Sequence, residues 1–352
     1  MINYKDIRHV HLELTEKCQA MCLQCPRTTS DGSLNKNLSL ADLNLENIKK
    51  IFTIKFILQL DEINLCGNYG DASLSKDCLL VLKYFREVNP RLKILFMTNG
   101  GARNVEFWKQ LAETLGENGR TIFAIDGLEE TSHIYRQGVV WTNVIRNLKA
   151  YVEAGGKGEW HYLVFEHNEH QVEEASALSA SLGLSFVKKV TSRMPQNATS
   201  KMFFTRKGEA IKLGIPNKAV NKSYTQTQKT IENYGSLSNY LDVAKVTCKT
   251  STRRSVFITA EGLLFPCCWI GALTNQNGLQ EPKKQFLGLL EKCGGKDKVN
   301  CIQKSIESIV EGSLFKEITD SWTKKSIKEG KLLTCSRQCG DEIRPFESQF
   351  VS

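Results

Sequence analysis

Up to about residue 190, short apolar runs alternate with longer amphipathic stretches. The apolar runs are typical of buried strands and cover 10–14, 62–66, 93–97, 121–126, 161–165 and 185–190. The amphipathic stretches are typical of helices and lie near 41–53, 75–88, 104–116, 142–154 and 170–182. Strands that alternate with helices in this way run parallel and are joined by right-handed crossovers. The pattern therefore predicts an α/β fold, an open sheet or a partial (β/α)6 barrel of the TIM type, with functional loops at the carboxyl ends of the strands.

The alternation stops after this region. Residues 194–246 are rich in Asn, Lys, Ser and Thr and include two prolines, which is typical of a connection or an insertion. Farther on, Val256–Phe265 predicts two short strands that fold back around Ala-Glu-Gly. A chain of 352 residues, 41% of them hydrophobic, can bury one large domain and a smaller one. We therefore expect a first domain over 1–193, a polar connection over 194–246 and a second domain over 247–352.

The composition indicates a soluble, cytoplasmic protein without a membrane partner. No apolar stretch approaches the roughly 18 residues that a membrane-spanning helix needs, and the N-terminus is not an export signal. Disulfides are not expected in a reducing compartment, so bound metal is the economical explanation for most of the twelve cysteines.

The net charge of +9 is confined to one segment. Between Lys188 and Thr250 there are twelve Lys or Arg against three Asp or Glu, and the rest of the chain is balanced. Such a segment could steer an anionic substrate or partner, such as a phosphorylated metabolite, a nucleotide sugar or nucleic acid. It could equally be a solvated surface insertion, because the charges show no regular spacing.

Three cysteines follow the first predicted strand in a Cys-x3-Cys-x2-Cys triplet, Cys18, Cys22 and Cys25. Three thiolates on a tight loop can hold three irons of a [4Fe–4S] cluster and leave the fourth iron open. A zinc site would need a fourth ligand, and no Cys or His lies close to Cys25 in sequence. We therefore favour the cluster over zinc.

This triplet resembles the signature of the radical S-adenosylmethionine (SAM) enzymes. The resemblance implies an open iron that chelates SAM and an electron transfer that cleaves SAM to a 5′-deoxyadenosyl radical. The residue before the last cysteine of the triplet is usually apolar or aromatic in this family, whereas here it is Gln24.

Other strand ends resemble further motifs of the family. The turn Cys66–Asp71 looks like its Gly-Gly-Glu motif, Met97–Gly101 like its Thr-Asn-Gly, and Ala124–Leu128 like a Ser-x-Asp-Gly in which Ala124 replaces the serine. Downstream, the planar guanidinium of Arg136 could pair with a carboxylate of SAM or of the substrate. The resemblance thus implies a SAM site made of Gly67, Asn68, Gly70, Asp71, Thr98, Asn99, Asp126 and Arg136.

The C-terminal cysteines resemble those of the SPASM and twitch domains appended to many radical SAM enzymes. Cys248 and Cys267 match the Cys-x(9–15)-Gly-x4-Cys element, and Cys335 and Cys339 match the final Cys-x3-Cys. Residues 305–318 look like the helix pair found in these domains. Because the other half of the SPASM pattern is absent, the resemblance implies a small α+β domain of the twitch type, with one auxiliary [4Fe–4S] cluster on these four cysteines. A closed four-thiolate zinc site is the alternative.

Cys268 directly follows one of the expected cluster ligands. A thiol is a good hydrogen-atom donor, and some radical SAM epimerases use a cysteine in that role, so Cys268 is a candidate catalytic residue. The alternative is a small buried cysteine that serves only in packing.

Two enzymatic functions follow from the resemblance. The first is oxidation or epimerisation of a polar small molecule, such as a sugar, an aminocyclitol or a nucleotide-linked metabolite, with electrons from a flavodoxin or a ferredoxin. The second is peptide modification, such as thioether or crosslink formation, which the absence of a leader-binding extension before residue 8 makes less favoured. A non-catalytic iron–sulfur protein that transfers electrons or binds nucleic acid is a third interpretation, supported only by the basic segment.

Overall fold

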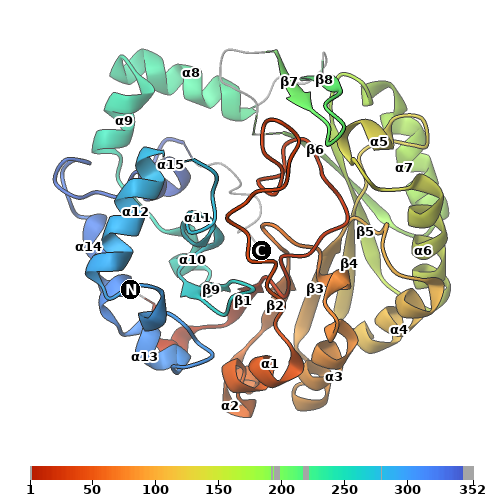
Figure 1. Ribbon diagram of the computed structural model, residues 1–352, viewed down its shortest axis with the longest axis horizontal. Helices are drawn as coiled ribbons and strands as arrows, with labels where there is room; N and C mark the ends of the chain where they lie inside the picture. The colour runs from red at the N-terminus through yellow and green to blue at the C-terminus, as the bar shows by residue number, and fades with distance from the viewer. Residues whose placement is uncertain (1, 192, 194–198, 217–221, 279, 344–352) are drawn as a thin grey trace. The chain divides into compact units, whose positions relative to one another are not determined.

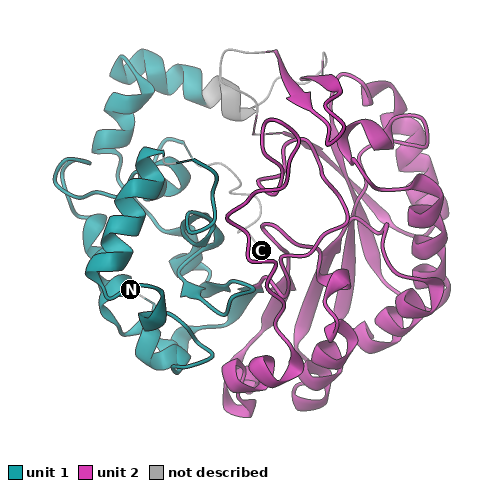
Figure 2. Ribbon diagram, viewed as in Figure 1, with its two compact units in different colours: residues 1–11, 220–352 teal, residues 12–219 magenta. Residues whose placement is uncertain are grey.

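Figure 1 shows a computed structural model of the chain, which describes residues 2–191, 193, 199–216, 222–278 and 280–343. The chain divides into two compact units (Figure 2). Unit 2 is Leu12–Ala219, and unit 1 is Met1–His11 together with Val220–Ser352. The division therefore falls inside the segment expected as a connection, and the first eleven residues belong with the C-terminal part.

Unit 2 is an α/β structure built on a parallel sheet. Strands β2 to β6 neighbour one another in chain order, and each neighbouring pair is parallel. Figure 1 shows helices α3, α4, α6 and α7 along one face of this sheet. This confirms the predicted α/β fold, and it is consistent with a partial barrel. The strands are β1 (His9–Leu12), which leads into unit 2, β2 (Glu62–Leu65), β3 (Lys93–Thr98), β4 (Gly119–Ala124), β5 (Gly158–Val164) and β6 (Ser185–Val190). The helices are α1 (Leu45–Ile51), α2 (Ile54–Gln59), α3 (Cys78–Val88), α4 (Val105–Leu115), α5 (Ser132–Tyr135), α6 (Trp141–Glu153) and α7 (Val172–Ser181).

Helix α4 shows why these stretches become helices against the sheet. Its N-cap is Asn104, whose side-chain oxygen accepts a hydrogen bond from the amide of Phe107 (3.1 Å). This bond satisfies a donor in the first turn that the helix itself leaves unpaired. Its buried side chains recur at helical spacing and form one apolar stripe. From this stripe Trp108 contacts Phe123 of β4, with ring centroids 5.7 Å apart, and Phe123 contacts Tyr151 of α6 at 5.5 Å. Helices and sheet therefore share one aromatic core.

The sheet alternates between a buried and a partly exposed face. In β3, Ile94 and Phe96 are buried, whereas Leu95 and Met97 between them are partly exposed. This period of two is that of a strand with different surroundings on its two faces. The carboxyl ends of the parallel strands lie at one edge, so the loops that follow β2, β3 and β4 are brought together there.

The segment expected as a connection contains regular structure that the hydrophobic pattern did not predict. Strands β7 (Ser200–Phe204) and β8 (Ala210–Gly214) form an antiparallel hairpin in unit 2, and α8 (Lys222–Tyr234) and α9 (Leu237–Val243) follow in unit 1. Polar side chains on the exposed faces of these elements dilute the apolar signal, which explains why the sequence pattern missed them.

Unit 1 contains the predicted hairpin, formed by β9 (Ser255–Ile258) and β10 (Leu264–Phe265), and two helices where 305–318 was expected to form them. Besides α8 and α9, its α-helices are α10 (Lys249–Thr252), α11 (Cys268–Ala272), α12 (Glu281–Lys292), α13 (Ile306–Val310), α14 (Ser313–Ser321) and α15 (Leu333–Cys339). None of the helices in the described ranges is long and apolar enough to cross a membrane.

Candidate functional site

The loop that carries Cys18, Cys22 and Cys25 follows β1 and is held by its backbone. The amide of Met21 donates a hydrogen bond to the carbonyl of Gln137 (2.8 Å), and the amide of Cys25 closes a tight turn on the carbonyl of Cys22 (3.0 Å). These bonds leave the loop little freedom, so its three thiols are presented together.

The three thiols lie in one apolar cluster of side chains. Cys22 is buried within it, and Cys18 and Cys25 pack against its edge. Burial raises the pKa of all three thiols, that of Cys22 to about 11, because a thiolate is poorly solvated there. Metal binding would reverse this preference, since the bound form is the thiolate. The other buried members of the cluster are Ala20, Leu23, Tyr135, Phe165, Phe203 and Leu213.

Arg136 and Asp126 form an ion pair next to this cluster. The Nε and Nη2 atoms of Arg136 each lie 2.7 Å from Oδ2 of Asp126, whose other oxygen accepts a hydrogen bond from the amide of Leu163 at 2.7 Å. The Nη1 atom of Arg136 lies 3.9 Å from the sulfur of Cys22. Both residues were expected in the SAM site, and the structure brings them together with the cysteine loop.

Asp71, Thr98 and Asn99 also meet at the strand ends. One oxygen of Asp71 accepts hydrogen bonds from the hydroxyl of Thr98 (2.9 Å) and from the backbone and side-chain amides of Asn99 (2.9 and 2.7 Å). The other oxygen accepts two more from Ser73. The side-chain nitrogen of Asn99 lies 3.7 Å from the sulfur of Cys18. Asp71 thus orders the Thr-Asn-Gly turn and fixes an amide beside the cysteine loop.

The turn after β2 is bound by a residue that the sequence pattern did not single out. Glu13 is buried, and its Oε1 accepts hydrogen bonds from the amides of Tyr69 (2.6 Å) and Gly70 (3.2 Å). Gly70 is one of the candidate SAM-site residues of this turn, together with Gly67, Asn68 and Asp71. Gly70 packs so closely on the Thr15 carbonyl that a side chain would collide with it. Burial raises the pKa of Glu13 to about 8, although these amides favour its charged form. The signal for Glu13 was the polar alternation of His9, His11 and Glu13 along the first strand.

Gln24, where the family usually has an apolar residue, is held by the end of β6. Its side-chain oxygen accepts a hydrogen bond from the hydroxyl of Thr191 (2.7 Å), and its carbonyl accepts one from Arg193 (2.9 Å). The side chain is buried, so a hydrogen-bonded amide lies where the family usually has an apolar side chain.

These surroundings fit a cluster with three thiolate ligands. The guanidinium of Arg136 and the amide of Asn99 lie next to two of the sulfurs, and such donors stabilise the negative charge of cluster sulfurs. Among the described residues, no group of three or more His, Cys, Asp or Glu is arranged to hold a single metal ion. A [4Fe–4S] cluster asks for a different arrangement, because each thiolate binds a different iron.

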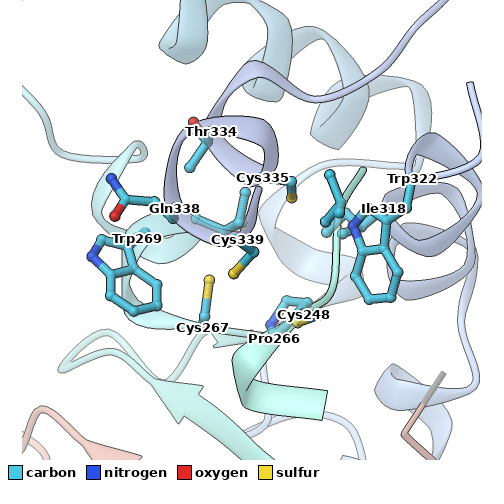
Figure 3. Close-up of a pocket in the computed structure, with 12 residues that line it drawn as sticks. Cys248, Pro266, Cys267, Trp269, Ile318, Trp322, Thr334, Cys335, Gln338 and Cys339 are labelled. Atoms are coloured by element: carbon cyan, nitrogen blue, oxygen red, sulfur yellow. The ribbon is translucent and has the colours of Figure 1, made fainter. Parts of the chain in front are cut away.

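The second cysteine set lines one cavity in unit 1 (Figure 3). Cys248 precedes α10, and Cys267 follows β10 at the start of α11. Cys335 and Cys339 lie on α15 four residues apart, a spacing that places both on one face of a helix. The hairpin and the helix therefore bring together four thiols that are distant in sequence. The cavity is also lined by Val246, Pro266, Trp269, Ile270, Ile318, Trp322, Thr334 and Gln338.

The electrostatics of this cavity suit a ligand that binds thiolates. A hydrogen bond between the thiols of Cys248 and Cys339 lowers the pKa of Cys248 and raises that of Cys339. Burial raises the pKa of Cys335 to about 12, and the indole N–H of Trp322 acts in the opposite direction. That N–H has no other partner among the described residues and is available to a thiolate ligand.

Cys268 is not among the residues that line this cavity and is half-buried on α11. Its neighbour Cys267 does line the cavity. The role of Cys268 as a hydrogen-atom donor stays a prediction.

Comparisons with known proteins give a likeness in fold. No protein-family model matches this chain, and no curated protein matches its sequence. The crystal structure of SuiB from Streptococcus suis matches with a TM-score of 0.55 and 12% identity, over 94% of this chain and 72% of SuiB. SuiB has also been solved with S-adenosylmethionine and with the precursor peptide SuiA. The structure of anSMEcpe with bound AdoMet matches with a TM-score of 0.53 and 12% identity, over 97% of this chain and 88% of that chain. This chain therefore has the fold of SuiB and anSMEcpe, two proteins whose structures contain bound SAM.

Proposed function

We propose that this chain is a radical SAM enzyme with two iron–sulfur clusters. The observation that supports this most is the thiol triplet Cys18, Cys22 and Cys25, gathered on the loop after β1 of a fold shared with two SAM-binding proteins. A [4Fe–4S] cluster with one open iron supplies, when bound, the electron that cleaves SAM to a 5′-deoxyadenosyl radical able to take a hydrogen atom from substrate.

The chain's own side chains have definite tasks in this proposal. The three thiolates hold the cluster, and Arg136 offsets their charge from 3.9 Å. The apolar side chains around Cys22 exclude water, which strengthens each of these interactions. The turn Gly67–Asp71, ordered by Glu13, and the pair Thr98 and Asn99, ordered by Asp71, are the proposed contacts of SAM.

The test is SAM cleavage by protein reconstituted with iron and sulfide without oxygen and reduced with dithionite. We expect 5′-deoxyadenosine from the wild type and none from the variant Cys18→Ala/Cys22→Ala/Cys25→Ala. Cys293→Ala, which changes a cysteine outside both sets, should behave as the wild type. A reconstituted wild-type protein that forms no 5′-deoxyadenosine would overturn the proposal.

The substrate we propose is a polar small molecule that is oxidised or epimerised, with Cys268 as a candidate hydrogen-atom donor in epimerisation. The basic residues of the segment 188–250 support an anionic substrate, because an excess of positive charge attracts one. If Cys268 donates the atom, product formed in deuterated water carries deuterium in the wild type and none in Cys268→Ala. A variant product that is still labelled excludes this role.

A peptide substrate is the second candidate, and one specific observation favours it. SuiB has been solved with its precursor peptide SuiA and anSMEcpe with a peptide, and both share the fold of this chain with TM-scores above 0.5. On this proposal the substrate is a polypeptide rather than a compact polar molecule.

One experiment separates the two substrate classes. Reconstituted protein is incubated with SAM and extracts of cells grown in deuterated medium, and deuterium in 5′-deoxyadenosine is measured by mass spectrometry. Transfer from the small-molecule fraction that survives protease treatment supports the small molecule. Transfer that protease abolishes supports the peptide.

A further inference from the structure

The hairpin β7–β8 packs directly on the loop of the cysteine triplet. Phe203 and Leu213 from its inner face are buried in the same apolar cluster as Cys22, and Ile211 packs against that cluster. At its base, the amide of Glu166 donates to the carbonyl of Gly214 (3.0 Å). The hairpin is therefore an anchored cover over the cysteine loop.

Its turn is anchored to the cysteine loop as well. Gly32 approaches the backbone of Phe204 and Thr205 so closely that a β-carbon would collide with it. The backbone of Gly32 also has a φ of +79°, a conformation that residues other than glycine rarely adopt. The hairpin is thus held at its base by the residue Glu166 and at its turn by the cysteine loop.

The outer face of the hairpin combines exposed apolar side chains with positive charge. Met202 and Phe204 are 50% and 43% exposed, and as residues two apart on one strand they lie on the same face. Lys212 pairs with Met202 across the two strands. The turn adds Arg206, Lys207 and Glu209, all exposed, so that the positive residues prevail. Lys201 does not add to this face, because it pairs with Leu213 and lies over the ring of Phe203 on the inner face.

We propose that this outer face is the docking surface for a small acidic protein that carries one electron at a time. The inference rests on the proposed function, because a cluster on Cys18, Cys22 and Cys25 needs an external reductant. Charge complementarity selects an acidic partner, and Met202 and Phe204 supply the apolar centre that transient interfaces place inside a charged rim. The step moves one electron from the carrier to the cluster, and no bond is formed or broken.

The position of the hairpin favours an electron carrier over nucleic acid. A packed layer of sheet is about 10 Å thick, and the residues of the inner face contact the cluster of side chains that contains Cys22. A carrier seated on the outer face is therefore separated from the cysteine loop by a single layer of protein. A nucleic acid would gain nothing from that closeness.

The experiment measures binding of an acidic flavodoxin to the full chain by calorimetry at two salt concentrations. The test variant is Arg206→Glu/Lys207→Glu/Lys212→Glu. We expect affinity to fall about tenfold or more, with most of the salt dependence lost. The control Lys55→Glu/Lys83→Glu/Lys109→Glu changes the net charge equally, on exposed helix positions of the same unit, and should bind nearly as the wild type.

A second variant and a second readout make the outcome decisive. Met202→Ser/Phe204→Ser, which keeps every charge, should weaken binding without changing its salt dependence. In the reconstituted protein, the charge variant should slow reduction by flavodoxin while reduction by dithionite and SAM cleavage remain as in the wild type. This separates the two proposals, because failure of SAM cleavage with dithionite concerns the proposed function alone.

Two results would overturn the docking surface. One is flavodoxin affinity in the charge variant equal to that of its matched control. The other is a loss of affinity for single-stranded RNA in the charge variant with flavodoxin binding unchanged, which would make the hairpin a nucleic-acid surface.

Discussion

Arg136 illustrates how single side chains organise the strand ends of unit 2. It joins a buried carboxylate, Asp126, to the sulfur of Cys22, and Asp126 in turn binds the amide of Leu163. The side chain of Asp126 is 2% exposed, so its charge depends on this one cation. Removal of one partner leaves a buried charge without compensation.

We therefore expect Arg136→Gln to lower the free energy of unfolding by about 3 kcal/mol or more. The double variant Arg136→Gln/Asp126→Asn should recover part of this loss, since both charges are then removed. Urea denaturation of the metal-free protein measures both. An effect below about 0.5 kcal/mol, the level of an ordinary surface substitution, would show that solvent compensates Asp126.

His167 predicts a dependence of stability on pH. Burial lowers its pKa to about 4, with His133 and His170 acting in the same direction, and neither ring nitrogen has a hydrogen-bond partner among the described residues. The folded protein thus favours the neutral ring that stacks on Phe165. Stability from His167 is complete above about pH 6.5, the ordinary pKa of histidine, and is lost as the pH falls toward 4.

In His167→Phe, the difference in melting temperature between pH 7.5 and about pH 5 should become smaller, because the residue no longer takes up a proton on unfolding. Differential scanning calorimetry at the two pH values measures this. His170→Gln, at an exposed position, removes only a lesser influence on His167 than burial and should keep most of the wild-type difference. Equal pH differences in wild type and His167→Phe would assign the acid sensitivity to other groups.

At this scale the sequence located residues whose chemistry shows in their spacing. The cysteine triplet and the Thr98–Asn99 turn were found because they form local motifs. Glu13 was missed, because the alternation of His9, His11 and Glu13 does not show which of these side chains has partners, and those of Glu13 lie 56 and 57 residues away. The pairing of Arg136 with Asp126 was also missed, although both residues had been singled out, since sequence spacing does not show which side chains face each other.

At the scale of elements, the geometry of a hairpin and of a helix brings three cysteines to one cavity. Helix α15 aligns Cys335 and Cys339 on one face, and the turn between β9 and β10 reverses the chain before Cys267. The second hairpin, β7–β8, works through its two faces: one is packed on the cysteine loop and the other is exposed.

Gly32 tests how firmly β7–β8 is held. Gly32→Ala should cost more than the roughly 1–2 kcal/mol of a side chain at positive φ, because the backbone of Thr205 must also move. Gly183→Ala, at φ +72° with no neighbour within 4 Å, carries only the backbone cost and is the matched control. Hydrogen exchange of residues 200–214 should accelerate in the first variant and stay unchanged in the second. Equal exchange in both variants would mean that the hairpin does not depend on this contact.

Elements were predictable where their apolar residues were regularly spaced. The β/α units and the β9–β10 hairpin have strong periodic signals, so their existence followed from the sequence. The signal of β7 and β8 is weak because charged residues occupy the exposed face, and Met202 and Phe204 break the alternation there.

At the scale of the whole molecule, the two cysteine sets belong to different compact units. Cys18, Cys22 and Cys25 lie in unit 2, and the other four lie in unit 1. Each set is completed by residues of its own unit. The two centres should therefore load independently.

Iron content tests this independence. The reconstituted wild type should hold about eight irons per chain, two clusters of four. The triple alanine variant of the triplet should hold about four, and so should Cys335→Ala/Cys339→Ala. Iron and sulfide analysis measures this, with Cys293→Ala as the control. If the triplet variant retains no iron although the wild type holds about four, the auxiliary cluster is absent.

The domain boundaries at 193 and 247 stay predictions, and the division by compactness falls at residue 219. Sequence pattern could not reveal that Met1–His11 belongs with the C-terminal part, because a unit assembled from two distant segments leaves no mark in local composition.

That discontinuity has a consequence for how the protein is made. The amide of Arg8 and the ring of His9 bind the carbonyls of Arg254 and Arg253, and His9 and Arg253 are 244 residues apart. At a synthesis rate of about 5–20 residues per second, the ribosome delivers these partners roughly 10–50 s after the N-terminal segment has appeared. Unit 2 can complete its local β/α contacts during that interval, whereas unit 1 must wait. Arg8 and His9 are thus synthesised long before the residues that bind them.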